Sequence, residues 1–253
     1  MIGATLKRGS DDMAMIGLIG GMSWESSLVY YRLLNEGVRK SRGGQHSAEI
    51  LMHSVDFAAI VALQKAGRWD EAGERLAAIA ARLEQGGADC VLICTNTMHL
   101  VADAVRGAIS VPLIDIIAET GAAIRAAGLA RPLLLATRYT MEHGFYAERL
   151  RNAAGIEVMV PGAAEDRALV HDVIFAELCQ GVVRDSSRLA LKRVVEAGRA
   201  AGADSVILGC TELCLLLDQP TLGCPLFDSA RIHAEAALAF ADRMDGHRIT
   251  KAA

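Results

Sequence analysis

Short apolar runs alternate with longer amphipathic stretches along this chain. The short runs are bounded by Gly, Pro, Asp or Ser, as buried strands are. In the longer stretches Ala and Leu recur at helical spacing, which predicts helices. Strands that alternate with helices are typical of βαβ units and a mostly parallel sheet, so the predicted fold class is α/β. Strands are expected at 15–19, 50–55, 90–94, 111–115, 132–136, 157–161, 206–208 and 226–228, helices at 25–34, 69–84, 119–127, 145–153, 166–180, 186–201 and 229–243, and a loop at 137–140.

Two of these strands lie in stretches that repeat each other. Residues 88–97 (ADCVLICTNT) align with residues 203–212 (ADSVILGCTE), and Thr95 then occupies the place of Cys210. The repeat predicts two pseudo-symmetric lobes, each a mostly parallel sheet flanked by helices, with the active site in the cleft between them. Lobe 1 is expected to comprise residues 15–117 plus 226–253, and lobe 2 residues 118–225. Residues 1–14 are polar and aperiodic, and are expected to form a disordered N-terminal extension.

Polar side chains gather where the predicted strands end, which is where open α/β sheets bind ligands. Cys210 follows a strand and precedes a predicted helix start at 211–213. A helix N-terminus lowers the pKa of a thiol, so we expect Cys210 to act as a base or nucleophile rather than as an inert core residue. The other polar residues at these ends are Ser23, Ser54, Thr95, Asn96, Thr97, Thr137, Thr211 and Glu212.

Composition and charge narrow the function further. The 253 residues carry a formal charge of −4, without the basic footprint of a nucleic-acid-binding protein. Their apolar runs are too short to span a membrane. Three of the six cysteines lie in or just after strand-like runs, which argues against a disulfide framework, and the cysteine spacings do not match a zinc motif. The sequence therefore predicts a reduced, cytoplasmic protein without a metal ion.

Four motifs resemble the aspartate/glutamate racemase family: residues 18–26 (LIGGMSWES), 94–99 (CTNTMH), 137–141 (TRYTM) and 209–213 (GCTEL). They are most similar to the enterobacterial-type aspartate/glutamate-specific racemases, and the resemblance covers residues 15–245. It implies a cofactor-independent enzyme, often a homodimer, with an amino acid as its substrate. In this family one residue from each lobe, usually a cysteine, moves the α-proton between the two faces of the substrate.

The resemblance implies that Cys210 is the thiol acid/base of lobe 2. The residue opposite it directly precedes an Asn-Thr pair, and here that residue is Thr95, with Cys94 one position earlier. Because side chains alternate across a strand, we expect Cys94 to point away from the cleft. Expected substrate-binding residues are Met22, Ser23, Asn96, Thr97, Thr137 and Thr211, together with Ser54 from its place at a strand end; Glu212 and His99 are expected to support the site.

Threonine in place of a second cysteine has a kinetic consequence. A hydroxyl is a far weaker acid than a thiol, so Thr95 needs a relaying water or a polarising neighbour. Because racemisation has an equilibrium constant of one, Thr95 slows turnover in both directions. It still allows Cys210 to exchange the α-proton of one enantiomer quickly.

Substrate and activity stay open at this point. Acid-specific relatives carry a lysine where this chain has Leu169, although Arg167 or His171 offers a replacement cation. The substrate is therefore aspartate, glutamate, or a neutral or basic amino acid. Alternative activities are those of hydantoin racemase, maleate isomerase or arylmalonate decarboxylase. A small-molecule-binding protein that kept the fold and lost turnover is the alternative outside enzymes.

Overall fold

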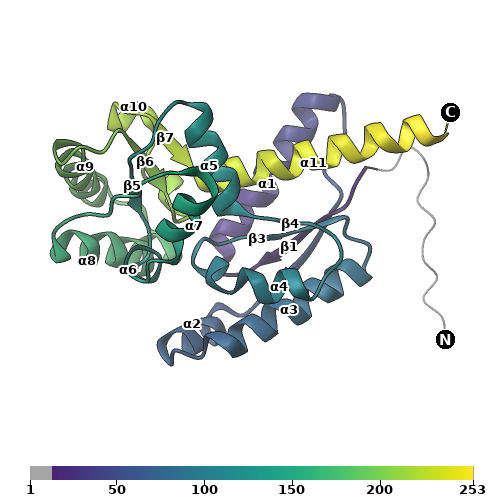
Figure 1. Cartoon of the computed structure of the whole chain (residues 1–253), viewed down its shortest axis with the longest axis horizontal. Coiled ribbons are helices and arrows are strands. Elements are labelled where there is room, and N and C mark those ends of the chain that lie inside the picture. The colour runs from purple at the N-terminus through teal and green to yellow at the C-terminus, as the bar shows by residue number, and fades with distance from the viewer. Residues whose placement is uncertain (1–12, 253) are drawn as a thin grey trace.

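The computed structural model describes the backbone of residues 13–252 and side chains as far as residue 244. Most of the predicted extension at 1–14 lies outside the described residues. The fold is α/β, with two parallel sheets flanked by helices (Figure 1). The first sheet has the strand order β2-β1-β3-β4, and the second has the order β5-β6-β7. The strands are β1 Ile16–Gly20, β2 Ile50–Ser54, β3 Cys90–Ile93, β4 Leu113–Ile114, β5 Pro132–Leu135, β6 Ser205–Leu208 and β7 Leu226–Asp228.

Helices cover both faces of the first sheet. Ile16 and Leu18 of β1 pack on the side of α1 and α11, whereas Ile19 packs on the side of α3 and α4. Parallel strands that are buried on both faces read as continuous apolar runs, which explains the short runs in the sequence. The helices of this lobe are α1 Trp24–Arg42, α2 Phe57–Lys65, α3 Trp69–Gln85, α4 Ala102–Gly107 and α11 Ser229–Ala252.

The second sheet is smaller and departs from the prediction in three places. The expected strand at 157–161 makes only one bridge, between Leu133 and Met159. The expected loop at 137–140 mostly belongs to helix α6, and the expected helix at 166–180 changes at Val173 into a π turn and then a 3₁₀ turn. The helices of this lobe are α5 Ile116–Ala126, α6 Arg138–Glu142, α7 Phe145–Ala154, α8 Ala164–Asp172, α9 Asp185–Ala200 and α10 Gln219–Leu222.

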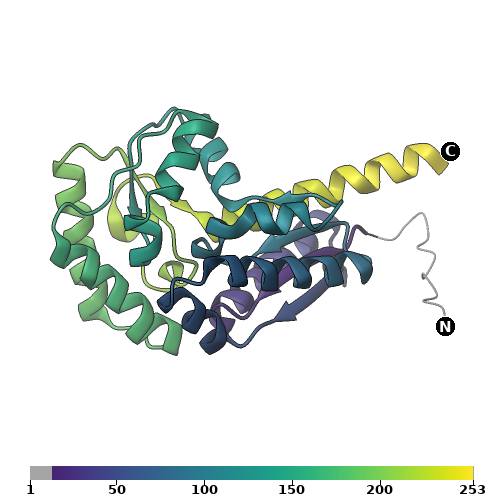
Figure 2. The same ribbon diagram turned by 60° about the horizontal axis from the view of Figure 1, so that its bottom comes forward.

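The chain crosses between the lobes after β4 and again after β7. At the first crossing Asp115 caps α5 by accepting hydrogen bonds from Ile117 N and Ala118 N. At the second, α11 leaves the second sheet, runs beside α1 and extends past the first lobe (Figure 1, Figure 2). In α11, His233 Nε2 lies 2.8 Å from Ile114 O, and its Nδ1 lies 2.8 Å from Tyr30 Oη. These contacts join the second crossing to the first sheet.

The lobes divide slightly differently from the prediction. Strand β7 was expected in lobe 1 but pairs with β6, so lobe 1 resumes only with α11. Ile116 and Ile117 belong to the core of lobe 2. The other residue limits given above for the two lobes stay predictions. In the part of the chain that the structure describes, no helix is long and apolar enough to cross a membrane.

Candidate active site

Strand β6 delivers Cys210 to a small cavity between the lobes. The strand ends at Leu208, and Gly209 N donates to Leu135 O of β5 at 2.8 Å. A Cβ atom on Gly209 would lie 2.4 Å from Leu134 Cδ1, so a larger residue here would displace the Leu134 side chain of β5. Cys210 follows with 8% of its surface exposed, and its thiol lines the cavity.

Glu212 is the charged group at the centre of this strand end. Its side chain is 2% exposed, and none of the described residues that line the cavity with it is basic. Four neutral groups donate to it instead, and a buried carboxylate without a cation is costly. The arrangement therefore favours a ligand that brings a cation. The donors are Ser23 Oγ, Cys179 Sγ at 3.7 Å, Cys210 Sγ at 2.9 Å and Thr211 Oγ1 at 2.9 Å.

The electrostatics of Cys210 differ from the expectation. Burial raises the pKa of its thiol well above the usual value, and the charges of Glu212 and Cys179 raise it further. The predicted helix start is only the 3₁₀ turn Leu213–Leu215, which is too short to supply the dipole of a helix. The expected lowering of the thiol pKa is therefore wrong, and the protonated thiol is the resting form.

Thr95 lines the same cavity from the end of β3. Its backbone N–H donates to Ile93 O at 2.8 Å, where the chain turns out of the strand. Cys94 is 1% exposed and packs in the core cluster shared by β1, α1 and α11. Burial raises the pKa of the Cys94 thiol. The cavity thus receives the side chain of Thr95, and Cys94 lies in the core.

Three buried hydroxyl groups meet beside Thr95 and join the two lobes. Thr97 Oγ1 lies 2.9 Å from Thr137 Oγ1 and 3.0 Å from Thr140 Oγ1, and the last two lie 3.2 Å apart. Thr97 and Thr137 line the cavity. Hydroxyl hydrogens rotate to suit their acceptor, so this cluster can turn its donors toward a carboxylate.

Met22 also lines the cavity, whereas Asn96 and His99 hold it from outside and Ser54 lies apart. Asn96 Nδ2 donates to Ser229 Oγ at 3.0 Å, while its buried Oδ1 has no partner. His99 Nδ1 lies 2.8 Å from Thr95 O, and its Nε2 accepts from Ile116 N at 3.2 Å, so His99 braces the loop. Burial lowers the pKa of His99. Ser54 was expected to bind substrate, but it lies exposed at the end of β2 and does not line the cavity.

The site cavity is nearly closed. Its volume is about 20 Å³, which is enough for one water molecule and too small for an amino acid. Several residues in its wall were not identified from the sequence, because they come from α2, α6 and the turns after α8. The sequence contained one signal for the helix that carries Phe57, because the preceding residue, Asp56, is of a type that often caps helices. In the structure Asp56 caps α2 by accepting a hydrogen bond from Ala58 N. The wall consists of Met22, Phe57, Gln64, Thr95, Thr97, Met98, Thr137, Tyr139, Ile174, Phe175, Cys179, Cys210 and Glu212.

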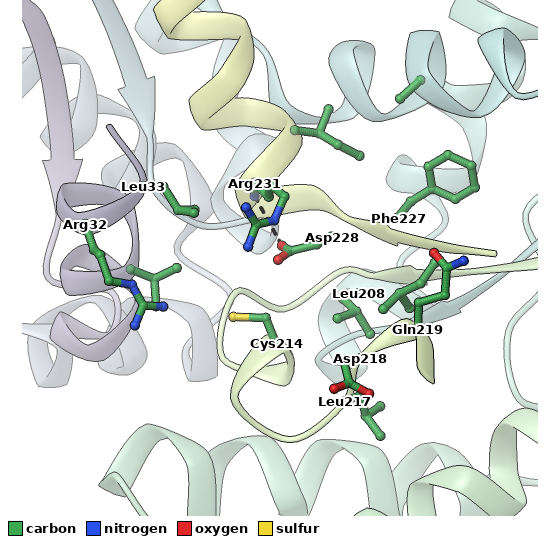
Figure 3. A pocket seen from close by; sticks show the side chains of 14 residues that line it. Arg32, Leu33, Leu208, Cys214, Leu217, Asp218, Gln219, Phe227, Asp228 and Arg231 are labelled. Carbon is green, nitrogen blue, oxygen red and sulfur yellow. Dashed lines mark hydrogen bonds between the residues drawn. The ribbon is translucent and has the colours of Figure 1, made fainter. Parts of the chain in front are cut away.

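A second and larger cavity lies at the junction of α1, α11 and the second sheet. Its volume is about 410 Å³, and none of the predicted site residues lines it. Arg32 of α1 and Arg231 of α11 line it together with Asp228 and Cys214, and Asp228 lies next to Arg231 (Figure 3). Burial raises the pKa of Asp228. The junction cavity is larger than the site cavity, but the strand-end thiol, hydroxyls and carboxylate favour the site cavity as the place of the chemistry.

Among the described residues, no three His, Cys, Asp or Glu side chains are grouped so that they could hold a metal ion. The chemistry available at the site is proton transfer by a thiol, assisted by a carboxylate and hydroxyl groups.

Comparison with known proteins shows what the chain is similar to. A family model for Asp/Glu/hydantoin racemases matches residues 19–237. A Yersinia pestis protein classed with the Asp/Glu racemases is 44% identical, with a TM-score of 0.83, and the match covers 90% of this chain and 99% of that one. An aspartate racemase homologue from Pyrococcus horikoshii is 32% identical, with a TM-score of 0.79, covering 91% and 100%. Glutamate racemase from Francisella tularensis, 16% identical with a TM-score of 0.63 and coverage of 92% and 81%, shares the fold.

Proposed function

The chain belongs to the Asp/Glu/hydantoin racemase family, and on this premise we propose that it is a cofactor-independent amino-acid racemase. Cys210 is the thiol acid/base on one face of the substrate, and Thr95 is the residue on the other. The observation that carries the proposal is that these two side chains, from strand ends of different lobes, line one cavity. Moving an α-proton requires a base on one face and a donor on the other, in a site closed to water.

Glu212 prepares the thiol for this step. It already accepts the hydrogen bond of Cys210 Sγ, so it takes the thiol proton when the thiolate forms. The ammonium group of the substrate binds beside the carboxylate and supplies the cation that the buried site lacks. A cation at this position also favours the thiolate, which offsets the raised pKa of Cys210.

The thiolate then takes the α-proton. The Cα–H bond breaks, an S–H bond forms, and the electron pair left on Cα delocalises into the α-carboxylate. Hydrogen bonds from Thr97 and Thr137 hold that carboxylate and stabilise its extra charge. The proton for the opposite face arrives through Thr95 and one relaying water, because a hydroxyl is too weak an acid to supply it alone.

Loss of optical rotation tests the activity directly. Each of the twenty amino acids is incubated with the enzyme without added cofactor, and its enantiomeric composition is followed by chiral chromatography. We expect at least one amino acid to racemise, and Cys210→Ser to abolish the reaction. Racemisation at an equal rate by Cys210→Ser would overturn the assignment of Cys210.

We also propose that the chain forms a homodimer through α1. Trp24, Leu28 and Tyr31 follow one face of this helix, and each is more than half exposed. Glu25 and Arg32 flank Leu28, so an antiparallel contact with a second copy would pair each Glu25 with the opposite Arg32. Exposed apolar stripes of this kind are typical of contact surfaces.

Charge reversal tests this contact by sedimentation. Glu25→Arg and Arg32→Glu should each weaken the dimer, and the double variant should restore it. Leu28→Arg should give a monomer. A wild-type monomer at micromolar concentration, or a double variant no better than the single ones, would refute the proposed surface.

We further propose that the enzyme works in the cytoplasm. Its mechanism needs the Cys210 thiol in the reduced state, and cytosolic reductants maintain that state. The cysteines of the described chain are all free, which supports this assignment.

A further inference from the structure

The wall of the site cavity is almost without charge. Of the residues that line it, Glu212 is the one Asp, Glu, Lys, Arg or His residue. Its carboxylate pairs with the ammonium group of an amino acid in the proposed mechanism, and the hydroxyls of Thr97 and Thr137 donate hydrogen bonds to the α-carboxylate. No charged group of this wall is left to pair with an acidic side chain of the substrate.

The basic residues nearby are engaged elsewhere. Arg167 pairs with Glu142 at 2.9 Å and donates to the carbonyl oxygens of Pro161 and Gly162. Leu169, which stands where acid-specific relatives carry lysine, packs against the core of lobe 2. Arg167 therefore supplies no cation to the cavity.

His171 and Arg138 do not supply a cation either. Burial, followed by the charge of Arg138, lowers the pKa of His171, so its ring is neutral near neutral pH. The ring accepts from Arg138 N and lies 4.7 Å from the ring of Phe175, centroid to centroid. The side chain of Arg138 is exposed and outside the cavity wall.

Two aromatic rings close the cavity where the lobes meet. Phe57 of α2 stacks on Phe175 of the π turn, with ring centroids 6.2 Å apart and planes inclined by 17°. Ile174, which is 1% exposed, lines the cavity beside them. A carboxylate against this wall would lose its hydration without gaining a partner, whereas an apolar side chain would replace water.

We propose that the substrate is an amino acid with an uncharged, mainly apolar side chain, and that Phe57, Ile174 and Phe175 form the wall that selects it. This inference rests on the proposed racemase function. It assigns the specificity of the enzyme to an aromatic gate made by both lobes, in a family whose members include racemases of acidic amino acids.

Paired measurements of binding and α-proton exchange in D₂O test the selection. Leucine and methionine are compared with aspartate and glutamate, by NMR for exchange and by thermal shift for binding. We expect kcat/KM for exchange of the neutral pair to exceed that of the acidic pair by at least about 100-fold. Stabilisation should follow the same order.

The two readouts separate the two proposals. Binding of neutral amino acids without exchange of any amino acid would overturn the racemase function and leave the selective wall supported. Stronger binding or faster exchange of aspartate or glutamate would overturn the selective wall and leave the racemase function intact. Failure of every neutral amino acid to bind would also overturn the wall.

A positive charge added to the wall should shift the substrate preference toward acidic amino acids. Phe175 is half-buried, so Phe175→Arg can place a guanidinium at the cavity, and it should move the preference toward glutamate by about tenfold or more. Leu189→Arg on exposed α9 adds the same charge elsewhere and should leave the preference unchanged. Phe175→Leu controls for loss of the ring and should keep the neutral preference. An unchanged preference in a folded Phe175→Arg protein would contradict the assigned wall.

Discussion

The ends of β3 and β6 are built on the same plan but carry different chemistry. Just before β3, Met15 N donates to Asp89 Oδ2 at 2.7 Å, and Asp89 N donates back to Met15 O. Before β6, Arg131 and Asp204 form the same reciprocal pair, with Arg131 N donating to Asp204 Oδ2 at 2.8 Å. In each lobe the repeated Asp thus joins the start of one strand to its neighbour. The repeat therefore preserves the scaffold.

The two ends differ in the residues that follow the strand. Thr95 stands in the place of Cys210, and Thr97 in the place of Glu212. One end therefore carries a neutral hydroxyl cluster, whereas the other carries a thiol bonded to a buried carboxylate. In the proposed mechanism the hydroxyl end suits the α-carboxylate of the substrate, and the thiol end suits its ammonium group and α-proton.

Replacing the thiol should have the largest effect. Cys210→Ser keeps the size of the side chain but removes the base, so α-proton exchange should fall by roughly 10³-fold or more. Thermal stabilisation by the substrate should persist, because Glu212 and the hydroxyls remain. Rapid exchange by this variant would show that the end of β6 is not the catalytic one.

A thiol at the end of β3 would give both strand ends the same reactive group. Thr95→Cys adds a second thiol opposite the first, so racemisation should accelerate by about 10-fold to 100-fold in both directions. Thr95→Val, of similar shape but without a hydroxyl, is the control and should racemise more slowly than wild type. If Thr95→Cys is no faster than wild type, Thr95 does not face the substrate as proposed.

Neutralising Glu212 should change the dependence of exchange on pH. The thiolate is the base and its pKa is raised, so wild-type exchange should rise with pH on the alkaline side. Glu212→Gln cannot take the thiol proton, and its rate near neutral pH should fall by about 100-fold. Its residual rate should rise at a lower pH than in wild type, because the charge of Glu212 no longer raises the pKa of Cys210. A profile that does not move would argue against this coupling.

The smallest effect is expected at the neighbouring cysteine. Cys94 packs in the core away from the cavity, so Cys94→Ala should leave exchange unchanged. The small void should lower the free energy of unfolding by about 1 kcal/mol, measured by denaturant titration. Loss of activity without loss of stability would indicate that Cys94, and not Thr95, is the second catalytic residue opposite Cys210.

The sequence predicted the scaffold better than the cavity. Apolar runs identified the strands except the one expected at 157–161, because the pattern of buried residues is local. The choice of Thr95 over Cys94 came from the family motif and the internal repeat, and it stays a prediction. The wall was missed because it depends on tertiary contacts, as between Phe57 and Phe175 across the lobes. The pKa of Cys210 was mispredicted because its burial and its carboxylate partner outweigh one short turn.

Initial wash-in of solvent deuterium at Cα, measured separately for each enantiomer of a substrate, tests the unequal roles of the two ends most directly. The α-proton of one enantiomer faces Cys210, and that of the other faces Thr95. We predict that one enantiomer exchanges much faster than it racemises, while the other exchanges no faster than it racemises. Thr95→Cys should make the two wash-in rates similar. Equal wash-in for both enantiomers of the wild-type enzyme would contradict the account.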